Sequence, residues 1–181
     1  VAETVRAEVR VKAAESNVLV FVPGNTGASF VRQELLIPEA KTVIVSNYPG
    51  DALDEAREAG VRKILLAGSL GKMVKLAGGV FYTHSRDADV RMDIMIRCAL
   101  RAGASMKLLR RIEDCVTTDA ALDLLEQDGL LDAVSEELLN RAQSYISRRA
   151  EEIETELILL RNSGDVIAFT ENAFSILGTV V

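Results

Sequence analysis

Three short apolar runs, each followed by a turn and a helical pattern, fill the first half of the chain. The runs NVLVFVP, KTVIVSN and VRKILLAG have little polar alternation, which is typical of parallel strands buried on both faces. Helical patterns occupy residues 2–15, SFVRQELL and Ala52–Ala59, where Gly60 can end the helix. This order predicts an α/β protein with a parallel sheet and helices on both faces, a three-layer α/β/α core of the Rossmann-like class.

The second half of the chain is mainly helical. Residues 88–102, 106–112, 119–126 and 131–148 carry helical periodicity. The stretch ETELILLRNSGDVIAFTEN then places two apolar runs around Asn-Ser-Gly-Asp, which indicates a β-hairpin, although a helix through Ile153–Leu160 is a competing interpretation. We therefore expect a core domain over residues 1–104 and, packed on it, a helical segment with a C-terminal hairpin over residues 105–181.

Composition narrows the range of partners. A net charge of −6 and the absence of Trp argue against a nucleic-acid binder. No apolar run reaches the length of a membrane span, and the start VAETVRAEVRVKAAES does not resemble a signal peptide, so we expect a cytoplasmic protein with no membrane partner. The two cysteines form no CxxC pair and there is a single His, so we expect free thiols and no metal site.

The turn PGNTG follows the first predicted strand and opens a helix. Gly24 and Gly27 permit a tight turn, Asn25 and Thr26 add side-chain donors, and the helix start attracts anions. This geometry suits a phosphate or a carboxylate, but the spacing of the three-glycine dinucleotide motif is absent. A purely structural turn is an equally good interpretation.

The second predicted strand ends at Asn47, with Asp51 close behind. In doubly wound folds a residue about twenty positions after the glycine turn faces the ribose of a nucleoside ligand. An amide can hydrogen-bond a ribose hydroxyl, so Asn47 and Asp51 are candidates for that contact. The alternative is a turn-forming Asn and a helix-capping Asp.

A second glycine turn, GSLGK, follows the third predicted strand. Gly68 and Gly71 flank it, and Lys72 and Lys75 lie three residues apart, which places them on one face of the next helix. The turn is not a Walker loop, because its spacing is too short and Met73 stands where Ser or Thr would bind magnesium. These differences argue against a phosphotransferase.

A polar turn, THSRDAD, follows the Gly78-Gly79 pair. His84 in such a turn, near a lysine-bearing helix, is a candidate general base or ligand. In the alternative interpretation Ser85 or Asp87 caps the next helix and His84 only satisfies backbone groups.

The ordered series PGNTG, SNYPGD, GSLGKMVKLAGG and THSRDADVR resembles the CbiD-type cobalt-precorrin-5B C(1)-methyltransferases. The resemblance covers roughly residues 1–134, and full-length members carry an additional N-terminal domain that this chain lacks. It implies transfer of a methyl group from S-adenosyl-L-methionine (AdoMet) to C1 of a cobalt-corrinoid tetrapyrrole in anaerobic cobalamin (vitamin B12) biosynthesis. A non-catalytic nucleotide- or AdoMet-binding module is the alternative, and a homo-oligomer is compatible with either function.

Under this resemblance the candidate residues fall into three groups. His84 would act catalytically, as a base or a positioning group rather than a cobalt ligand, because the metal belongs to the substrate. The residues expected to bind AdoMet are Gly24, Asn25, Thr26, Gly27, Asn47 and Asp51. The substrate carries acetate and propionate arms, so the basic region near the second turn is expected to bind it through Gly68, Gly71, Lys72, Lys75, Thr83, Ser85, Arg86, Asp89 and Arg91.

Overall fold

The computed structural model describes residues 1–86, 89–176 and 178, which contain a five-stranded sheet in the order β2-β1-β3-β4-β5. The first four strands in that order run parallel, and β5 is antiparallel to β4. The strands are β1 (Val18–Val22), β2 (Thr42–Ile44), β3 (Lys63–Ser69), β4 (Glu154–Leu160) and β5 (Val166–Phe169).

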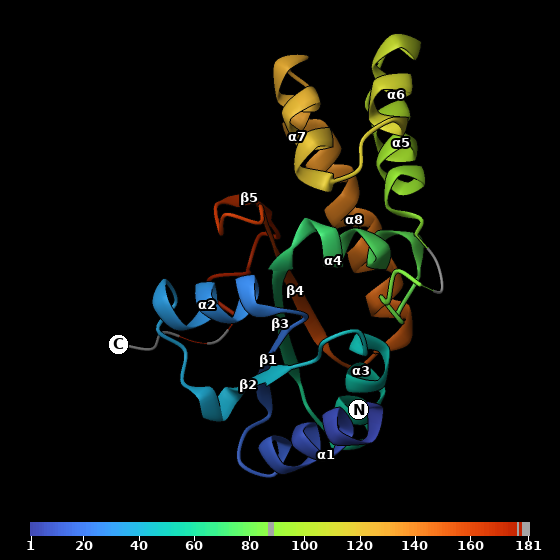
Figure 1. Ribbon diagram of the computed structural model, residues 1–181. Helices are drawn as coiled ribbons and strands as arrows, with labels where there is room; N and C mark the ends of the chain where they lie inside the picture. The colour runs from blue at the N-terminus through green and yellow to red at the C-terminus, as the bar shows by residue number, and fades with distance from the viewer. Residues whose placement is uncertain (87–88, 177, 179–181) are drawn as a thin grey trace.

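Helices cover both faces of the sheet, so the predicted three-layer α/β/α core is confirmed. On one face Leu19 and Phe21 pack with residues of α1 (Ala2–Ala13), α3 (Pro49–Glu58) and α8 (Leu131–Arg149). On the other face Val20 and Val22 pack with α2 (Asn25–Gln33) and with Ala173 and Ile176. Figure 1 shows α2 on the opposite side of the sheet from α3 and α8.

The remaining helices lie mainly beyond the carboxyl ends of the parallel strands. The end of β3 continues into α4 (Leu70–Met73) and η2 (Val74–Gly78), and η1 (Glu39–Lys41) precedes β2. Figure 1 shows α5 (Arg91–Arg101), α6 (Met106–Glu113) and α7 (Thr118–Gln127) rising above α4. None of the helices in the described ranges is both long and apolar enough to cross a bilayer.

The C-terminal hairpin is confirmed, and the helix through Ile153–Leu160 is wrong. Strand β4 does more than form the hairpin, because it pairs in parallel with β3 along its whole length, from Lys63 opposite Glu154 to Ser69 opposite Leu160. The expected division at residues 104 and 105 therefore falls between strands of one sheet.

Three expectations for local structure need correction. The second apolar run is not buried on both faces, because β2 is only three residues long at the edge of the sheet and Ile44 is 48% exposed. The helix after β3 is not continuous, since α4 gives way to the 3-10 helix η2, which ends at Gly79 in the left-handed conformation. The helix expected from residue 88 begins at Arg91, and Ala88 lies outside the described residues.

Candidate functional site

Both glycine turns lie at the point where the strand order reverses. The chain passes from β1 to β2 on one side and then to β3 on the other, and ligands of such folds bind at the carboxyl ends of these strands. A Cβ at Gly27 would lie 2.1 Å from the Ala67 carbonyl oxygen, and one at Gly68 would lie 2.6 Å from Pro23 Cγ. The two turns therefore pack directly against each other through glycine.

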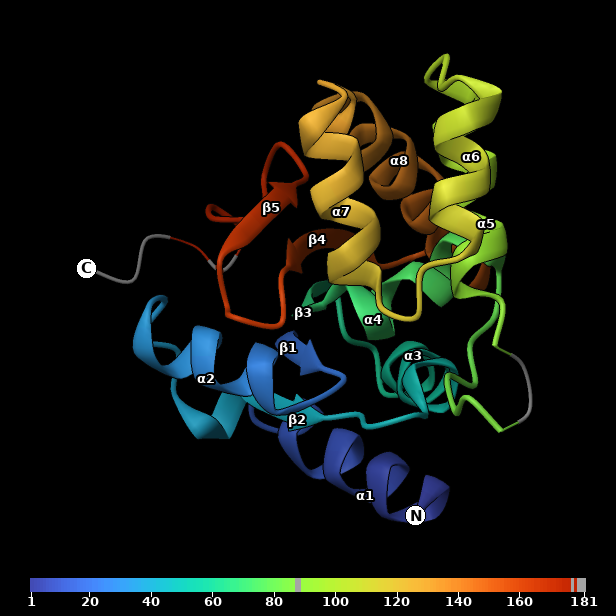
Figure 2. The ribbon, with the colours of Figure 1, turned by 45° about the horizontal axis from the view of Figure 1, so that its top comes forward.

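A groove of about 660 Å³ opens between α2 and the turn that joins β4 to β5. We call it the α2 groove, and Figure 2 shows the two segments that flank it. Asn25 and Thr26, at the start of α2, line the groove. A Cβ added at Gly24 would meet no atom within 4 Å, so the space beside this residue is open. The described residues that line the groove are Asn25, Thr26, Ser29, Phe30, Gln33, Glu34, Asn162, Ser163, Gly164, Asp165 and Val166.

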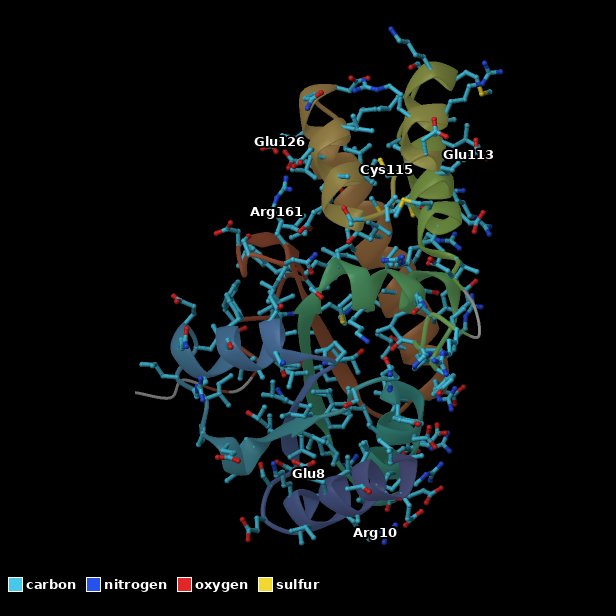
Figure 3. The ribbon with its side chains drawn as sticks, in the orientation of Figure 1. Glu8, Arg10, Glu113, Cys115, Glu126 and Arg161 are labelled. Carbon is cyan, nitrogen blue, oxygen red and sulfur yellow. The ribbon has the colours of Figure 1, made fainter. Side chains whose placement is uncertain are left out.

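Helix α7 holds the wall of the α2 groove that comes from the β4–β5 turn. The Arg161 guanidinium lies 2.8 Å from an Asp123 oxygen and 2.9 Å from a Glu126 oxygen. The Asn162 N–H donates to Asp119 Oδ2 at 3.2 Å. Figure 3 shows Arg161 and Glu126 pointing toward each other from the two elements.

A second, smaller cavity of about 190 Å³ lies near the carboxyl ends of β2 and β3. We call it the lysine pocket. Every described residue that lines it is among those predicted for the site: Asn47, Gly71, Lys72, Lys75, Thr83, His84, Ser85 and Arg91. Asn47 lies here, beside the expected substrate residues, and is absent from the lining of the α2 groove.

Asn47 connects three segments of the chain in the lysine pocket. Its side-chain oxygen accepts from Lys72 Nζ at 2.7 Å and from Thr83 Oγ1 at 3.3 Å. Its carbonyl accepts the Thr83 N–H at 3.0 Å, and Lys75 Nζ donates to the Thr83 carbonyl, also at 3.0 Å. The preceding residue, Ser46, has φ of 51°, a strained backbone conformation of the kind that is common at binding sites.

Positive charge predominates around the lysine pocket. Lys75 is only 1% exposed, and Arg91 makes a two-point ion pair with Asp89 at 2.7 and 2.9 Å. The Arg91 hydrogen bond lowers the pKa of Asp89, burial opposes it, and the charge of Lys75 lowers it further. Asp89 therefore neutralises the charge of Arg91, while Lys72 and Lys75 add positive charge to the lining of the pocket.

His84 has a defined hydrogen bond. Its Nδ1 accepts the Arg86 N–H at 3.1 Å, so this nitrogen carries no proton and a neutral ring carries its proton on Nε2. The expectation that His84 satisfies a backbone group agrees with this contact. Ser85 does not cap the next helix, because Val90 precedes Arg91 at its start. Asp87 lies outside the described residues.

Several predicted residues lie outside both cavities. Asp51 accepts from Arg6 of α1 at 3.1 and 3.2 Å, and Arg86 is exposed on the segment next to the lysine pocket. The β4–β5 turn was missed as part of the site, although its polar sequence after an apolar strand is typical of a binding loop. In the described part of the chain, no group of three His, Cys, Asp or Glu side chains is arranged to hold a metal ion.

Comparison with known proteins gives consistent matches. A family model described as "CbiD, C-terminal domain" matches residues 82–171. The cobalt-precorrin-5B C(1)-methyltransferase of Clostridioides difficile (strain 630) is 32% identical over 157 residues, which are 85% of this chain and 38% of that protein. Its counterpart in Photorhabdus laumondii is 40% identical over 138 residues, 75% of this chain and 36% of that protein. The chain thus spans less than half the length of these curated relatives.

Proposed function

Because the chain belongs to the CbiD-type cobalt-precorrin-5B C(1)-methyltransferase family, we propose that it is the AdoMet- and substrate-binding part of such an enzyme. The reaction is transfer of a methyl group from AdoMet to C1 of cobalt-precorrin-5B in cobalamin biosynthesis. The observation that carries the proposal is the pair of cavities, one beside the start of α2 and one beside Asn47 and Lys72, near the carboxyl ends of the parallel strands, where a sheet of this order binds its ligands.

The α2 groove suits AdoMet in size and in donor set. Its 660 Å³ is within the range of about 300–1,000 Å³ that is usual for small-molecule sites. Asn25 and Thr26 would donate to the carboxylate at the start of α2, and Asp165 would accept from the ribose hydroxyls. AdoMet supplies an electrophilic methyl group when it is bound, and the chain supplies the orientation.

The lysine pocket suits an anionic arm of the substrate. Lys72, Lys75 and Arg91 present cationic groups to a cavity that is too small for a macrocycle. Holding one carboxylate arm fixes the ring relative to the α2 groove, and such alignment supplies much of the acceleration of a two-substrate transfer. His84 would donate a hydrogen bond from Nε2 and so position the substrate, since Nδ1 already accepts from the Arg86 backbone.

Calorimetric titration with S-adenosylhomocysteine tests the assignment of the α2 groove. We expect binding by the chain, and a loss of about tenfold in affinity for Asp165→Asn because one charged hydrogen bond is weakened. Asp114→Asn, which changes an exposed carboxylate at the end of α6, is the matched control. Absence of binding to the wild-type chain at ligand concentrations on the order of 1 mM would overturn the assignment.

A non-catalytic AdoMet-binding module is the second candidate, and the observation in its favour is that the lysine pocket, at about 190 Å³, is too small to enclose a macrocycle. A chain that binds S-adenosylhomocysteine but supports no methyl transfer, even when it is joined to the part of the Clostridioides difficile relative that it does not match, would support this candidate. We further expect the protein to be cytoplasmic and to bind no nucleic acid. Analytical ultracentrifugation would show whether it forms a homo-oligomer.

A further inference from the structure

Three aromatic rings form a row beside the lysine pocket. The Tyr48 and Tyr82 ring centroids are 5.2 Å apart with ring planes 52° apart. The Tyr82 and His84 centroids are 6.3 Å apart with ring planes only 17° from parallel. Tyr48 precedes α3, whereas Tyr82 and His84 come from the segment that follows η2. His84 belongs both to this row and to the lining of the lysine pocket, so the two features are continuous.

The segment that carries Tyr82 is held on both sides by backbone hydrogen bonds. The Gly50 N–H donates to the Phe81 carbonyl at 3.2 Å, and the Thr83 N–H donates to the Asn47 carbonyl at 3.0 Å. Thr83 is buried, and Arg149 lies 4.8 Å from the centre of the Phe81 ring. Tyr82 is 42% exposed. Its side chain is therefore accessible on a segment whose backbone is held in place.

The dimensions of the lysine pocket leave most of a corrinoid outside it. Cavities that enclose a drug-sized ligand measure about 300–1,000 Å³, and the lysine pocket measures about 190 Å³. It can hold a carboxylate arm against Lys72 and the buried Lys75, but the macrocycle must then lie at the rim. His84 lines the pocket, and the Tyr82 ring lies next to it, nearly parallel and with 6.3 Å between the ring centroids.

We propose that the nearly parallel rings of Tyr82 and His84 form a stacking platform for the flat face of the corrinoid macrocycle while one acidic arm enters the lysine pocket, and that Tyr48, tilted by 52° to Tyr82, supports the Tyr82 ring. This inference rests on the proposed function and assigns Tyr82 as the main contact. Aromatic faces pack well against extended conjugated surfaces, and Tyr loses little conformational freedom when it does so. The platform recognises the ring, and the lysines recognise the charge.

Two probes separate these contributions. Cobyrinic acid carries the corrin ring with free carboxylate arms, and its heptamethyl ester carries the same ring without those charges. Titrations of the chain with each probe, followed by visible absorption of the corrinoid, should show that Tyr82→Leu weakens binding of both by about three- to tenfold. Tyr82→Phe, which keeps the ring, should restore affinity to within about twofold of the wild type.

The controls test the specificity of the effect. Phe174→Leu removes a ring that is 50% exposed, compared with 42% for Tyr82, and packs edge-on against Phe169 beside the sheet, and it should leave both affinities unchanged. Lys75→Met should weaken binding of the acid about tenfold more than binding of the ester. Thermal melting of each variant establishes that it is folded.

Some outcomes would overturn the platform. If Tyr82→Leu binds both probes like the wild type, or if Phe174→Leu weakens them as much, the platform is wrong while the proposed function stands. A wild-type chain that binds S-adenosylhomocysteine but neither corrinoid would overturn the platform together with the substrate half of the proposed function.

Discussion

The hydrogen bond at His84 decides which proton transfers its ring can perform. Because Nδ1 accepts the Arg86 N–H at 3.1 Å, a neutral ring presents a donor at Nε2 rather than a base. Of the two roles expected from the sequence, this geometry favours a positioning group over a general base. A donor at Nε2 suits a carboxylate or carbonyl oxygen of the substrate.

Replacement of His84 distinguishes these roles. In a hybrid that joins this chain to the part of the Clostridioides difficile relative that it does not match, we expect His84→Ala to lower turnover about tenfold or more, which is the usual lower range for loss of a positioned polar group. His84→Gln keeps an N–H donor at a similar reach, so it should recover most of that loss. Affinity for S-adenosylhomocysteine should stay near that of the wild type in both variants. Equal loss of turnover in the Ala and Gln variants would instead support general-base catalysis.

We expect Ala substitutions at the two glycines of the first turn to have different effects on stability. Gly27→Ala places a Cβ 2.1 Å from the Ala67 carbonyl oxygen, so it should destabilise the fold by about 1–3 kcal/mol, as overpacking usually does. Gly24→Ala meets nothing within 4 Å and has φ of −174°, so stability should change by less than about 0.5 kcal/mol. Its methyl group would occupy space next to Asn25 and should weaken S-adenosylhomocysteine binding. Urea unfolding and calorimetry would measure the two effects.

The sequence predicted which residues line the lysine pocket, but it did not predict correctly which candidate residues lie together. Lys72, Lys75 and His84 are within thirteen positions of one another, so their proximity follows from local patterns. Asn47 was grouped with the AdoMet residues, but it contacts Thr83 through both its backbone and its side chain. Residues 36 positions apart meet only after the sheet has formed, and no local periodicity encodes that contact.

At the scale of elements, ion pairs attach α1 to α3. Glu55 is 5% exposed and accepts from Arg10 at 2.7 Å, while Arg6 lies 3.6 Å from its other oxygen and 3.1 Å from Asp51. The hydrogen bond from Arg10 lowers the pKa of Glu55, burial opposes this, and the charges of both arginines lower it further. This carboxylate therefore contributes to the contact of the two helices only in its ionised form.

This contact predicts how stability depends on pH. A carboxyl group with a lowered folded pKa stabilises the native state above its ordinary pKa, and that contribution is lost as the pH falls through the folded pKa. We expect Glu55→Gln to reduce the free energy of unfolding at pH 7 by about 1–3 kcal/mol. The difference between wild type and variant should shrink in acid. Urea unfolding at several pH values measures it, and a difference that is constant with pH would contradict the assignment.

The element pattern was predictable, whereas the place of β4 was not. The hairpin motif around Asn-Ser-Gly-Asp identified both strands, because the turn chemistry is local. Pairing of β4 with β3 joins segments about ninety residues apart, and four helices intervene after η2. The interruption between α4 and η2 was also missed, since Lys72 and Lys75 fit a continuous helical pattern equally well.

At the scale of the whole molecule, the two cavities share the carboxyl edge of a single sheet. The α2 groove takes one wall from the β4–β5 turn, and the lysine pocket takes residues from the ends of β2 and β3 and from the segment before α5. Each cavity is therefore built from chain segments that are distant in sequence. We therefore propose that this chain binds AdoMet and the substrate, and we test turnover in a protein that includes the part of the relatives that it does not match.

Methyl transfer by a hybrid protein is the most direct test of the proposal that this chain binds AdoMet and the substrate. The hybrid joins the part of the Clostridioides difficile relative that this chain does not match to residues 1–181, and mass spectrometry follows cobalt-precorrin-5B in the presence of AdoMet. We predict a product heavier by one methyl group, formed about tenfold more slowly by the Lys75→Met hybrid. A hybrid that binds S-adenosylhomocysteine as tightly as the relative, yet leaves the substrate unchanged while the relative methylates it, would contradict the account.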